Sequence, residues 1–327
     1  MITKSIRALL TVGLMAMLSL ASPLALAAEF PTKPLRLLIP FAPGGAVTFL
    51  AEQIMKEMEA QLGQPIVRDY RGGAGGTIAM ELAAAAPNDG YTLFLLSTSQ
   101  AISAGVYETL KVNVARDFAP VSLLAFTPYV LVINPDSVPV QNVQQLAVWA
   151  KANPGKLFLG TSGAGNSDAI VGAEFARTLG IQITQVPYRG AGPAIPDLLS
   201  GRVNISFFSP LPTKQHVESG KLRMLGVTTK DRSPAMPNIA TIAEQGLPGF
   251  DFPGWYGIAV PSGTPPAVIA TLQRATAAAL ERQSVKGFLL TNGLSAGGGP
   301  SAEFGSFLVS EITRWSRLAK SMGIKPE

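Results

Sequence analysis

Apolar and polar residues near the start of the exported chain follow the pattern of a strand, a turn and a helix. The apolar run Leu35 to Ile39 has strand length. Apolar residues then recur at helical spacing, at Val47, Leu50, Ala51, Ile54, Met58 and Leu62. The turn Pro43-Gly44-Gly45 therefore precedes a helix N-terminus, where unpaired N–H groups and a positive dipole end suit an anion. Because glycine has no Cβ to keep a ligand away, we interpret this turn as one half of a carboxylate clamp.

Strands and helices continue to alternate over the following residues. A short strand is expected at 65–67, a helix at 78–86 and a strand at 91–96. This order predicts a mostly parallel sheet with helices on its faces. Ligands of such sheets bind beyond the carboxyl ends of the strands. The turn Pro43-Gly44-Gly45 and the polar run Ser97-Thr98-Ser99 both fall at that edge.

The same pattern repeats in the second half of the chain. A strand at 156–159 leads into a glycine turn at 160–167 and a helix at 170–179, which predicts a second domain. Further strands are expected at 129–133, 183–186, 203–208, 222–227 and 255–260, with helices at 143–152 and 194–200. The proline-rich segment 234–253 has the composition of a long surface connection.

The final helices complete the predicted topology. One starts at Pro265-Pro266, where proline suits a first turn, and the other near Ser301. If both return to the first domain, the chain crosses twice, near Pro128 and near Gly254. We therefore expect two lobes joined by a two-strand hinge with a cleft between them. Lobe 1 comprises 28–127 plus 254–327, and lobe 2 comprises 128–253.

The N-terminus has the features of an export signal. Lys4 and Arg7 precede an apolar run from Ala8 to Leu20, and Ala25-Leu26-Ala27 is a small-x-small cleavage pattern. We expect a signal peptide at 1–27, cleaved near Ala27, and a periplasmic mature protein. The uninterrupted apolar run is shorter than the ~20 residues of a membrane span. With no cysteine in the chain, neither a disulfide framework nor a lipid-anchored N-terminus is possible, so the fold depends on its core.

Composition and charge exclude several classes of function. The formal net charge of +5 becomes +3 once Lys4 and Arg7 are removed, and the basic residues are scattered, which argues against a nucleic-acid partner. A single histidine, His216, and no cysteine argue against a zinc site. About 300 residues remain after export, enough for two domains.

Enzyme motifs are incomplete, and we expect no cofactor and no catalytic residue. Gly73-Ala74-Gly75 is followed by Ile78 where the dinucleotide fingerprint needs glycine, and there is no Gly-Lys-Ser/Thr phosphate loop. Ser162 has Ala164 where a nucleophile elbow needs glycine. His216 is expected on a helix with no acid nearby in sequence, so a secreted histidine-based hydrolase is the remaining enzyme alternative.

Seven motifs in order resemble one known family, the Bug receptors of tripartite tricarboxylate transporters. They are Pro40-Phe41-Ala42-Pro43-Gly44-Gly45, Gly73-Ala74-Gly75-Gly76, Asp89-Gly90-Tyr91-Thr92-Leu93, Gly160-Thr161-Ser162-Gly163, Val186-Pro187-Tyr188-Arg189-Gly190, Gly220-Lys221-Leu222-Arg223 and Gly246-Leu247-Pro248-Gly249-Phe250. The resemblance covers essentially the whole mature chain. It implies an α/β, two-lobed periplasmic-binding-protein fold of type II that closes on a small organic carboxylate. It also implies delivery to membrane permease subunits, and we expect a monomer.

Candidate ligand-binding residues lie on the turns that this resemblance places at the cleft. They are Phe41, Ala42, Gly44, Gly45, Ser97, Thr98, Thr161, Ser162, Gly163, Tyr188, Arg189 and Phe208. The serines and threonines are equally suited to capping helices. Arg189 could pair with a ligand carboxylate or with a structural acid, and both alternatives stay open. A receptor that signals to a membrane sensor kinase would use the same cleft, so sensing remains an alternative to transport.

Three positions depart from the common family pattern. The chain has Thr48 and Phe208 where relatives often carry aspartate, and Ala169 where they often carry histidine. If these positions line the pocket, its far end is less polar than usual. Apolar contact is worth ~25 cal/mol per Å². We therefore expect an aromatic or long-chain carboxylate without an amino group, rather than an amino acid or citrate.

Overall fold

Two β-sheets organise the part of the chain that the structure describes. The computed structural model describes residues 30–106 and 110–321. The first sheet has six strands in the order β11-β4-β10-β3-β1-β2. Their bounds are β1 (Leu35–Ile39), β2 (Ile66–Tyr70), β3 (Thr92–Ser97), β4 (Phe118–Pro128), β10 (Pro253–Pro261) and β11 (Ser295–Gly298). The predicted signal peptide lies outside the described residues.

The second sheet has five strands in the order β7-β6-β8-β5-β9. Their bounds are β5 (Val130–Ile133), β6 (Phe158–Thr161), β7 (Thr184–Pro187), β8 (Ile205–Phe208) and β9 (Arg223–Val227). Strands β3, β1 and β2 pair in parallel, as do β7, β6 and β8. Strands β4, β10, β11, β5 and β9 add antiparallel pairs. Both sheets are therefore mixed rather than mostly parallel.

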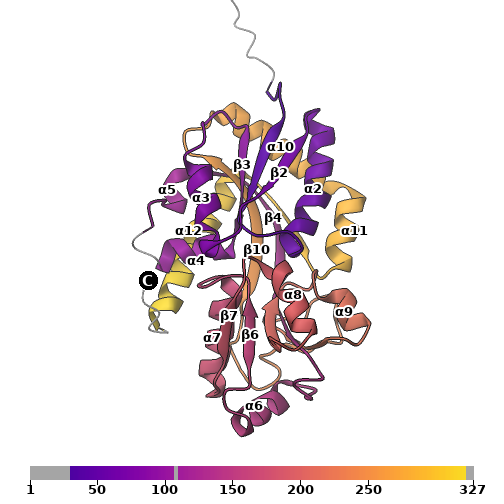
Figure 1. The fold of residues 1–327 in the computed structure, drawn as a ribbon. Helices are drawn as coiled ribbons and strands as arrows, with labels where there is room; N and C mark the ends of the chain where they lie inside the picture. Colours follow the sequence, from indigo (N-terminus) through magenta and orange to yellow (C-terminus); the bar gives the residue numbers. More distant parts are fainter. Residues whose placement is uncertain (1–29, 107–109, 322–327) are drawn as a thin grey trace, which may run out of the picture. The chain divides into compact units, whose positions relative to one another are not determined.

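Helices flank these strands (Figure 1). Their bounds are α2 (Ala46–Leu62), α3 (Thr77–Ala84), α4 (Thr98–Val106), α5 (Val114–Asp117), α6 (Val143–Ala152), α7 (Ser167–Leu179), α8 (Ala191–Leu199), α9 (Lys214–Glu218), α10 (Pro266–Glu281), α11 (Gln283–Thr291) and α12 (Ser301–Ser321), with a 3-10 turn, η1, at Ala74–Gly76. The strands and helices expected from periodicity are confirmed, most within a few residues. Sequence reasoning missed β4, α4, α5, α11 and β11. Strand β4 contains Pro120, and proline inside a run argues against a strand.

Two neighbouring strands carry the chain between the sheets. Strand β4 ends at Pro128, and β5 of the second sheet begins at Val130. Strand β10 begins directly after Phe252, and the Phe252 N–H donates to the Thr228 carbonyl at 2.8 Å. Pro253 then pairs with Pro128 in the antiparallel ladder (Figure 1). Both passages therefore run side by side and are hydrogen-bonded to each other. The exact lobe boundaries stay a prediction.

The segment 234–253 does not behave as a simple surface connection. Ile242, Leu247, Phe250 and Phe252 are buried within it. The Phe250 ring packs edge-to-face on Phe252, with centroids 4.7 Å apart. The expectation of a surface segment is wrong for these residues, because they complete the core beneath the second sheet.

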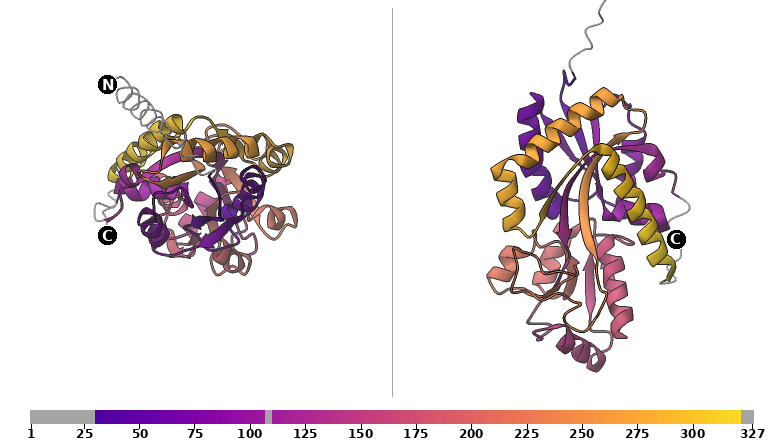
Figure 2. Two further views of the ribbon diagram at one scale, coloured as in Figure 1. Left: turned by 90° about the horizontal axis from the view of Figure 1, so that it is seen from above. Right: turned by 180° about the vertical axis from the view of Figure 1, so that it is seen from behind.

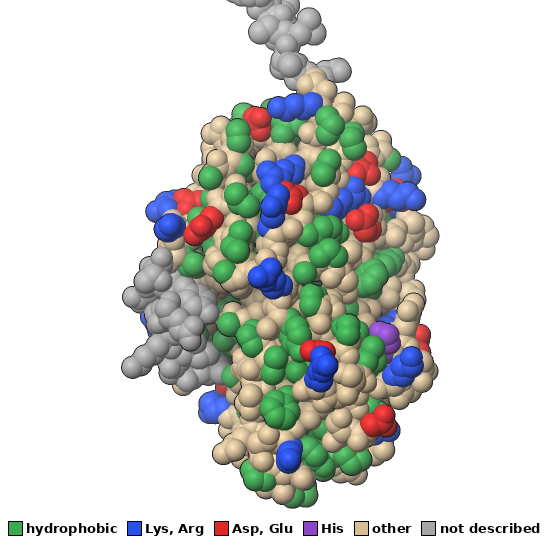
Figure 3. Space-filling view, in the orientation of Figure 1, with side chains coloured by type: hydrophobic (Ala, Val, Ile, Leu, Met, Phe, Trp, Pro, Cys, Tyr) green, Lys and Arg blue, Asp and Glu red, His purple; other side chains and the backbone are tan. Residues whose placement is uncertain are grey.

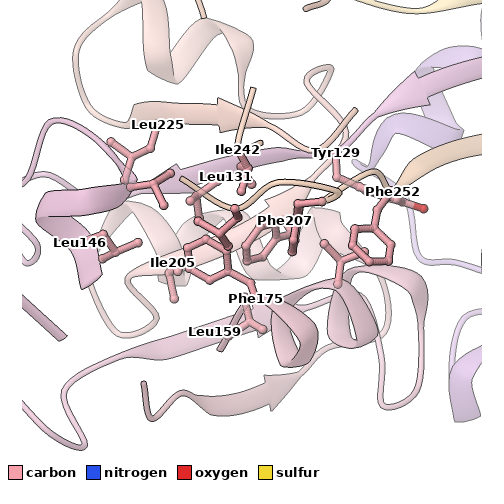
Figure 4. Packing of buried hydrophobic residues seen from close by; sticks show 14 of the residues in the cluster. Tyr129, Leu131, Leu146, Leu159, Phe175, Ile205, Phe207, Leu225, Ile242 and Phe252 are labelled. Atoms are coloured by element: carbon pink, nitrogen blue, oxygen red, sulfur yellow. The ribbon is translucent and has the colours of Figure 1, made fainter. Parts of the chain in front are cut away.

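Each sheet has its own hydrophobic core. The first core includes Leu38, Phe94, Trp255, Phe304 and Leu308. The second core includes Phe175, Ile205, Phe207, Phe252 and Trp315. Figure 4 shows the rings of Phe175, Phe207 and Phe252 gathered among aliphatic side chains of the second core.

Helix α12 contributes side chains to both cores. It packs along α4 and β4 and is yellow in the right-hand view of Figure 2. Glu311, 5% exposed, lies midway along it and accepts hydrogen bonds from the indole Nε1 of Trp255 at 2.9 Å and of Trp315 at 3.1 Å. Because the two indoles belong to different cores, one carboxylate connects them. The last helix therefore packs mainly on elements of the first sheet, as expected, and also places Trp315 and Ala319 in the second core.

Charged side chains are dispersed over the face seen in Figure 3, where blue and red groups are interspersed. That face carries no concentrated basic patch among its described residues. Among residues 30–106 and 110–321, no helix combines the length and apolar character needed to cross a bilayer.

We expect Glu311→Ala to lower the free energy of unfolding by roughly 2–6 kcal/mol, because it leaves two buried indole donors without an acceptor at roughly 1–3 kcal/mol each. Guanidinium denaturation followed by circular dichroism measures this loss. Glu311→Gln keeps an acceptor and should lose less. The exposed Glu303→Ala on the same helix is the control, and an equal loss in Glu303→Ala and Glu311→Ala would contradict the bridging role.

Candidate functional site

A small cavity lies between residues of the two sheets. The elements of the first sheet contribute Phe41, Gly45, Ala46, Val47, Ser97, Ser99 and Tyr256, and the remaining lining residues are Tyr129, Ser162, Ser167, Asp168, Ala191, Phe207, Phe208, Ser209 and Pro212. The cavity volume of about 50 Å³ is several times what one water molecule needs. It therefore has room for a small organic ion rather than a dinucleotide.

Four helices begin at this cavity. Residues of the first turns of α2, α4, α7 and α8 are among its lining, including Ala46, Ser99, Ser167 and Ala191. The residues that precede α2, α7 and α8 make no side-chain capping bond. First-turn N–H groups have no intrahelical acceptor and carry positive partial charge. The arrangement therefore favours negative charge in the cavity without a basic side chain.

One negative charge is already present. The Asp168 carboxylate is 2% exposed and accepts hydrogen bonds from the Ser162 N–H at 2.5 Å and the Ser162 hydroxyl at 2.8 Å. Burial raises the pKa of Asp168 to about 6, although the hydrogen bonds from Ser162 and from the first N–H groups of α7 act in the opposite direction. The donors of the second glycine turn are thus engaged by a side chain of this protein.

Hydroxyl groups bridge the cavity walls. The Tyr129 hydroxyl donates to Ser167 Oγ at 2.7 Å, and Ser167 Oγ lies 3.3 Å from Ser99 Oγ. Thr127 Oγ1 and Ser209 Oγ are 2.9 Å apart. Burial raises the pKa of Tyr129 well above its usual range, so its phenol stays protonated. These bonds join α4 and β4 of the first sheet to residues of the second.

Five aromatic rings line the rest of the cavity: Phe41, Tyr129, Phe207, Phe208 and Tyr256. Burial raises the pKa of Tyr256 as well, so both tyrosines present neutral hydroxyls. The cavity therefore combines apolar ring surface with hydrogen-bond donors. This combination suits a ligand with one anionic end and an apolar body.

Backbone contacts join the two sides near the cavity at two places. The Ala42 N–H donates to the Arg189 carbonyl at 2.8 Å, which joins the turn after β1 to the turn after β7. A Cβ on Gly192 would lie 2.1 Å from the Pro43 carbonyl oxygen, too close for any side chain. At the second place, a Cβ on Gly163 would lie 3.6 Å from the Gly75 Cα. Gly192 therefore allows the first contact, whereas the second distance would be an ordinary van der Waals contact.

The candidate residues from the sequence separate into two groups. Phe41, Gly45, Ser97, Ser162 and Phe208 line the cavity. The other seven are not among the lining: Ala42, Gly44, Thr98, Thr161, Gly163, Tyr188 and Arg189.

The residues of the second group have other contacts. Ala42 and Gly44 belong to the closing contact, and Thr98 Oγ1 accepts from the Trp255 N–H at 3.0 Å. The Tyr188 hydroxyl donates to Asp197 at 2.7 Å. Gly163, Tyr188 and Arg189 line a separate hollow of about 570 Å³. Thr161 is fully buried.

Sequence reasoning missed several lining residues, and Asp168 is the most consequential. Its position at the start of a helix after a glycine turn is visible in the sequence. The sequence analysis, however, expects the N–H groups of that turn to bind the carboxylate of a ligand rather than that of Asp168. Of the three departures from the family pattern, Phe208 lines the cavity. The Thr48 hydroxyl instead accepts from the Gly44 N–H at 2.9 Å, and Ala169 is buried outside the lining.

Two mixed α/β sheets linked by neighbouring strands, with a small cavity between their elements, define a two-lobed binding protein. The family model of the tripartite tricarboxylate transporter receptors matches residues 50–324. The chain belongs to this family of periplasmic solute-binding receptors, as the motifs predicted.

Three known proteins illustrate the similarity. BugT of Bordetella pertussis is 32% identical, with 98% of each chain covered. A solved R. palustris protein with adipate is 34% identical with a TM-score of 0.86, covering 91% of this chain and 100% of its own. MatC from Rhodopseudomonas palustris with bound malate is 29% identical with a TM-score of 0.84, covering 88% and 99%. The similarity thus extends over nearly the whole length of each relative.

We expect the stability of the protein to depend on the ionisation of Asp168. Its pKa is raised from 3.8 to about 6 in the folded state, so its contribution is fully present below about pH 4 and is lost as the pH rises through about 6. The difference corresponds to roughly 3 kcal/mol. The Asp168→Asn variant cannot ionise at this position. Its thermal midpoint, compared with that of the unaltered protein, should therefore rise as the pH increases from about 4 through about 6.

Thermal unfolding followed by circular dichroism at several pH values measures this gain. The exposed Asp136→Asn is the control and should track the unaltered protein. A constant difference between Asp168→Asn and the unaltered protein from about pH 4 to about pH 7 would show that Asp168 does not titrate there.

Proposed function

We propose that this protein is a periplasmic receptor that captures a small organic carboxylate in the cavity and delivers it to tripartite tricarboxylate-type permease subunits. The observation that carries the proposal is the convergence of four helix N-termini on one small cavity. Family membership and the adipate and malate seen with two relatives support it. Export through the signal peptide at 1–27 and a monomeric state are part of the same proposal.

The ligand carboxylate is assigned to the turn before α2. Gly45 leaves the first N–H groups of this helix without a capping side chain, and its own lack of a Cβ keeps access open. Ser97, at the end of β3, also lines the cavity. The Ser162 donors already serve Asp168, so the opposite turn is not assigned to the ligand carboxylate.

The apolar body of the ligand is assigned to the aromatic rings. Phe208 is 2% exposed and packs against Ala194 and Ile195, which fixes the ring at the cavity wall. A ligand ring stacked on it would gain ~0.5–1.5 kcal/mol beyond area burial. The proposed ligand is therefore an aromatic or long-chain carboxylate without an amino group. This preference now rests on the five rings rather than on Thr48 and Ala169.

Closure is assigned to the two-strand hinge formed by β4 and β10. The proposed lobes are 28–127 plus 254–327 and 128–253, each carrying one sheet. Opening would separate Ala42 from Arg189 and Gly44 from Gly192, and would expose the cavity. The ligand stabilises the closed form because only that form places both walls against it.

We expect benzoate or adipate to raise the thermal midpoint of the exported form more than aspartate or citrate, since a ligand bound only by the folded state stabilises it. Calorimetry then measures the affinity. Phe208→Ala should weaken binding by roughly 10–100-fold through lost apolar contact of roughly 1.5–3 kcal/mol. The exposed ring of Phe49 on α2 gives the control variant Phe49→Ala. Tight binding of aspartate or citrate, with no response to benzoate or adipate, would refute the ligand assignment.

We expect Gly192→Ala to block closure, because its Cβ would overlap the Pro43 carbonyl. Carboxylate binding should fall by at least about tenfold, with a native circular dichroism spectrum. Solution scattering should show no ligand-induced decrease in the radius of gyration. Gly287→Ala is the control, since a Cβ there meets no atom within 4 Å. Undiminished affinity in Gly192→Ala would mean that the observed contact is not required for capture.

A further inference from the structure

Asp168 creates an electrostatic conflict for any anion in this cavity. Among the described residues that line it, Asp168 carries the formal charge, and none is lysine, arginine or histidine. A ligand carboxylate would therefore share about 50 Å³ with a second carboxylate and no cation. Two like charges in such a site cannot both remain ionised at low cost, so one of them takes a proton.

The surroundings identify Asp168 as the group that takes the proton. Its carboxylate is 2% exposed, whereas the ligand carboxylate is assigned to the uncapped start of α2. Unpaired N–H groups at that helix start stabilise the ionised form of the ligand. Ser162 donates to the two oxygens of Asp168. A neutral Asp168 keeps these bonds and gains an O–H that can donate into the cavity.

We propose that a carboxylate ligand enters together with one proton, which is taken from solvent and held on Asp168. This inference rests on the proposed function and deepens it, since it makes the receptor a proton-linked anion binder. Protonation converts the second carboxylate from a repelling group into a hydrogen-bond donor. It also disfavours compact ligands with several negative charges, because each further charge would need another proton or cation.

The other titratable groups near Asp168 do not replace it in this role. Elements α4, β6 and β8, which surround the start of α7, contain no titratable side chain among their described residues. Tyr129 and Tyr256 face the cavity, and burial keeps both phenols protonated. Glu311 of α12 is held by the two indoles and by Arg314 outside the cavity lining. Asp168 is the remaining group whose burial places its pKa, about 6, near neutrality.

Calorimetry with benzoate and with adipate tests the proposal. In two buffers of different ionisation enthalpy at about pH 7, binding of benzoate to the unaltered protein should take up close to one proton, and binding of adipate, which has a second carboxylate, at least as much. The Kd should rise by up to about tenfold per pH unit from about pH 6 to about pH 8. Asp168→Asn should bind with a Kd that does not change over this range and without proton uptake. Asp136→Asn, which is not among the lining residues, should keep the pH dependence.

The possible results separate this inference from the proposed function. Carboxylate binding by the unaltered protein that is independent of pH and buffer would overturn the inference and leave the proposed function intact. Loss of binding by Asp168→Asn at every pH, with the fold retained, would show instead that an ionised Asp168 holds a donor group of the ligand. If neither carboxylate binds to either protein at any pH, the proposed function fails and the inference fails with it.

Discussion

The contact between two backbone turns is the constraint on which the rest of the site depends. The Ala42 N–H reaches the Arg189 carbonyl because Gly72, Gly190 and Gly192 have no side chains: a Cβ on Gly72 would lie 2.7 Å from both atoms of this bond. This approach seals one side of the cavity and places the start of α2 opposite the start of α8. A side chain at Gly192 would push the turns apart and admit water. Electrostatic attraction to a ligand would then weaken, because water screens charges far better than a protein interior does.

Charge in the closed cavity is balanced by helix ends rather than by basic side chains. Arg189 is the cation among the candidate residues from the sequence. It lines the neighbouring hollow instead, and its carbonyl accepts the hydrogen bond from the Ala42 N–H. Helix N-termini provide diffuse positive charge that needs no flexible side chain to be ordered. Their number limits how much negative charge the cavity can hold. The buried Asp168 carboxylate already accepts hydrogen bonds from Ser162 and from the first N–H groups of α7. These groups cannot also stabilise a ligand anion, which is why our proposal links the ionisation of Asp168 to ligand binding.

Much of the fold could be predicted from the sequence, because apolar periodicity is a local property. The strand, glycine turn and helix around Pro43-Gly44-Gly45 occur as expected, and so does the repeat after β6. Side-chain roles were harder to predict, since they depend on contacts between distant segments. Gly44 and Gly163 lie against glycines of the opposite turns, and their expected contact with a ligand stays a prediction. Asp168 could not be assigned, because only the folded turn shows that its carboxylate reaches the Ser162 donors.

The connections between the two sides of the cavity differ in strength, and this difference determines how the site can open. The Ala42–Arg189 bond and the Ser99–Ser167 and Thr127–Ser209 pairs are single hydrogen bonds, each worth roughly 0.5–1.5 kcal/mol. Strands β4 and β10 are paired along their whole length, and Glu311 connects two buried indoles. In the opening that we propose, the few weak bonds at the cavity would break while the strands behind it stay paired. A ligand needs to favour the closed form by only a few kcal/mol to shift that balance, which is within reach of a small carboxylate.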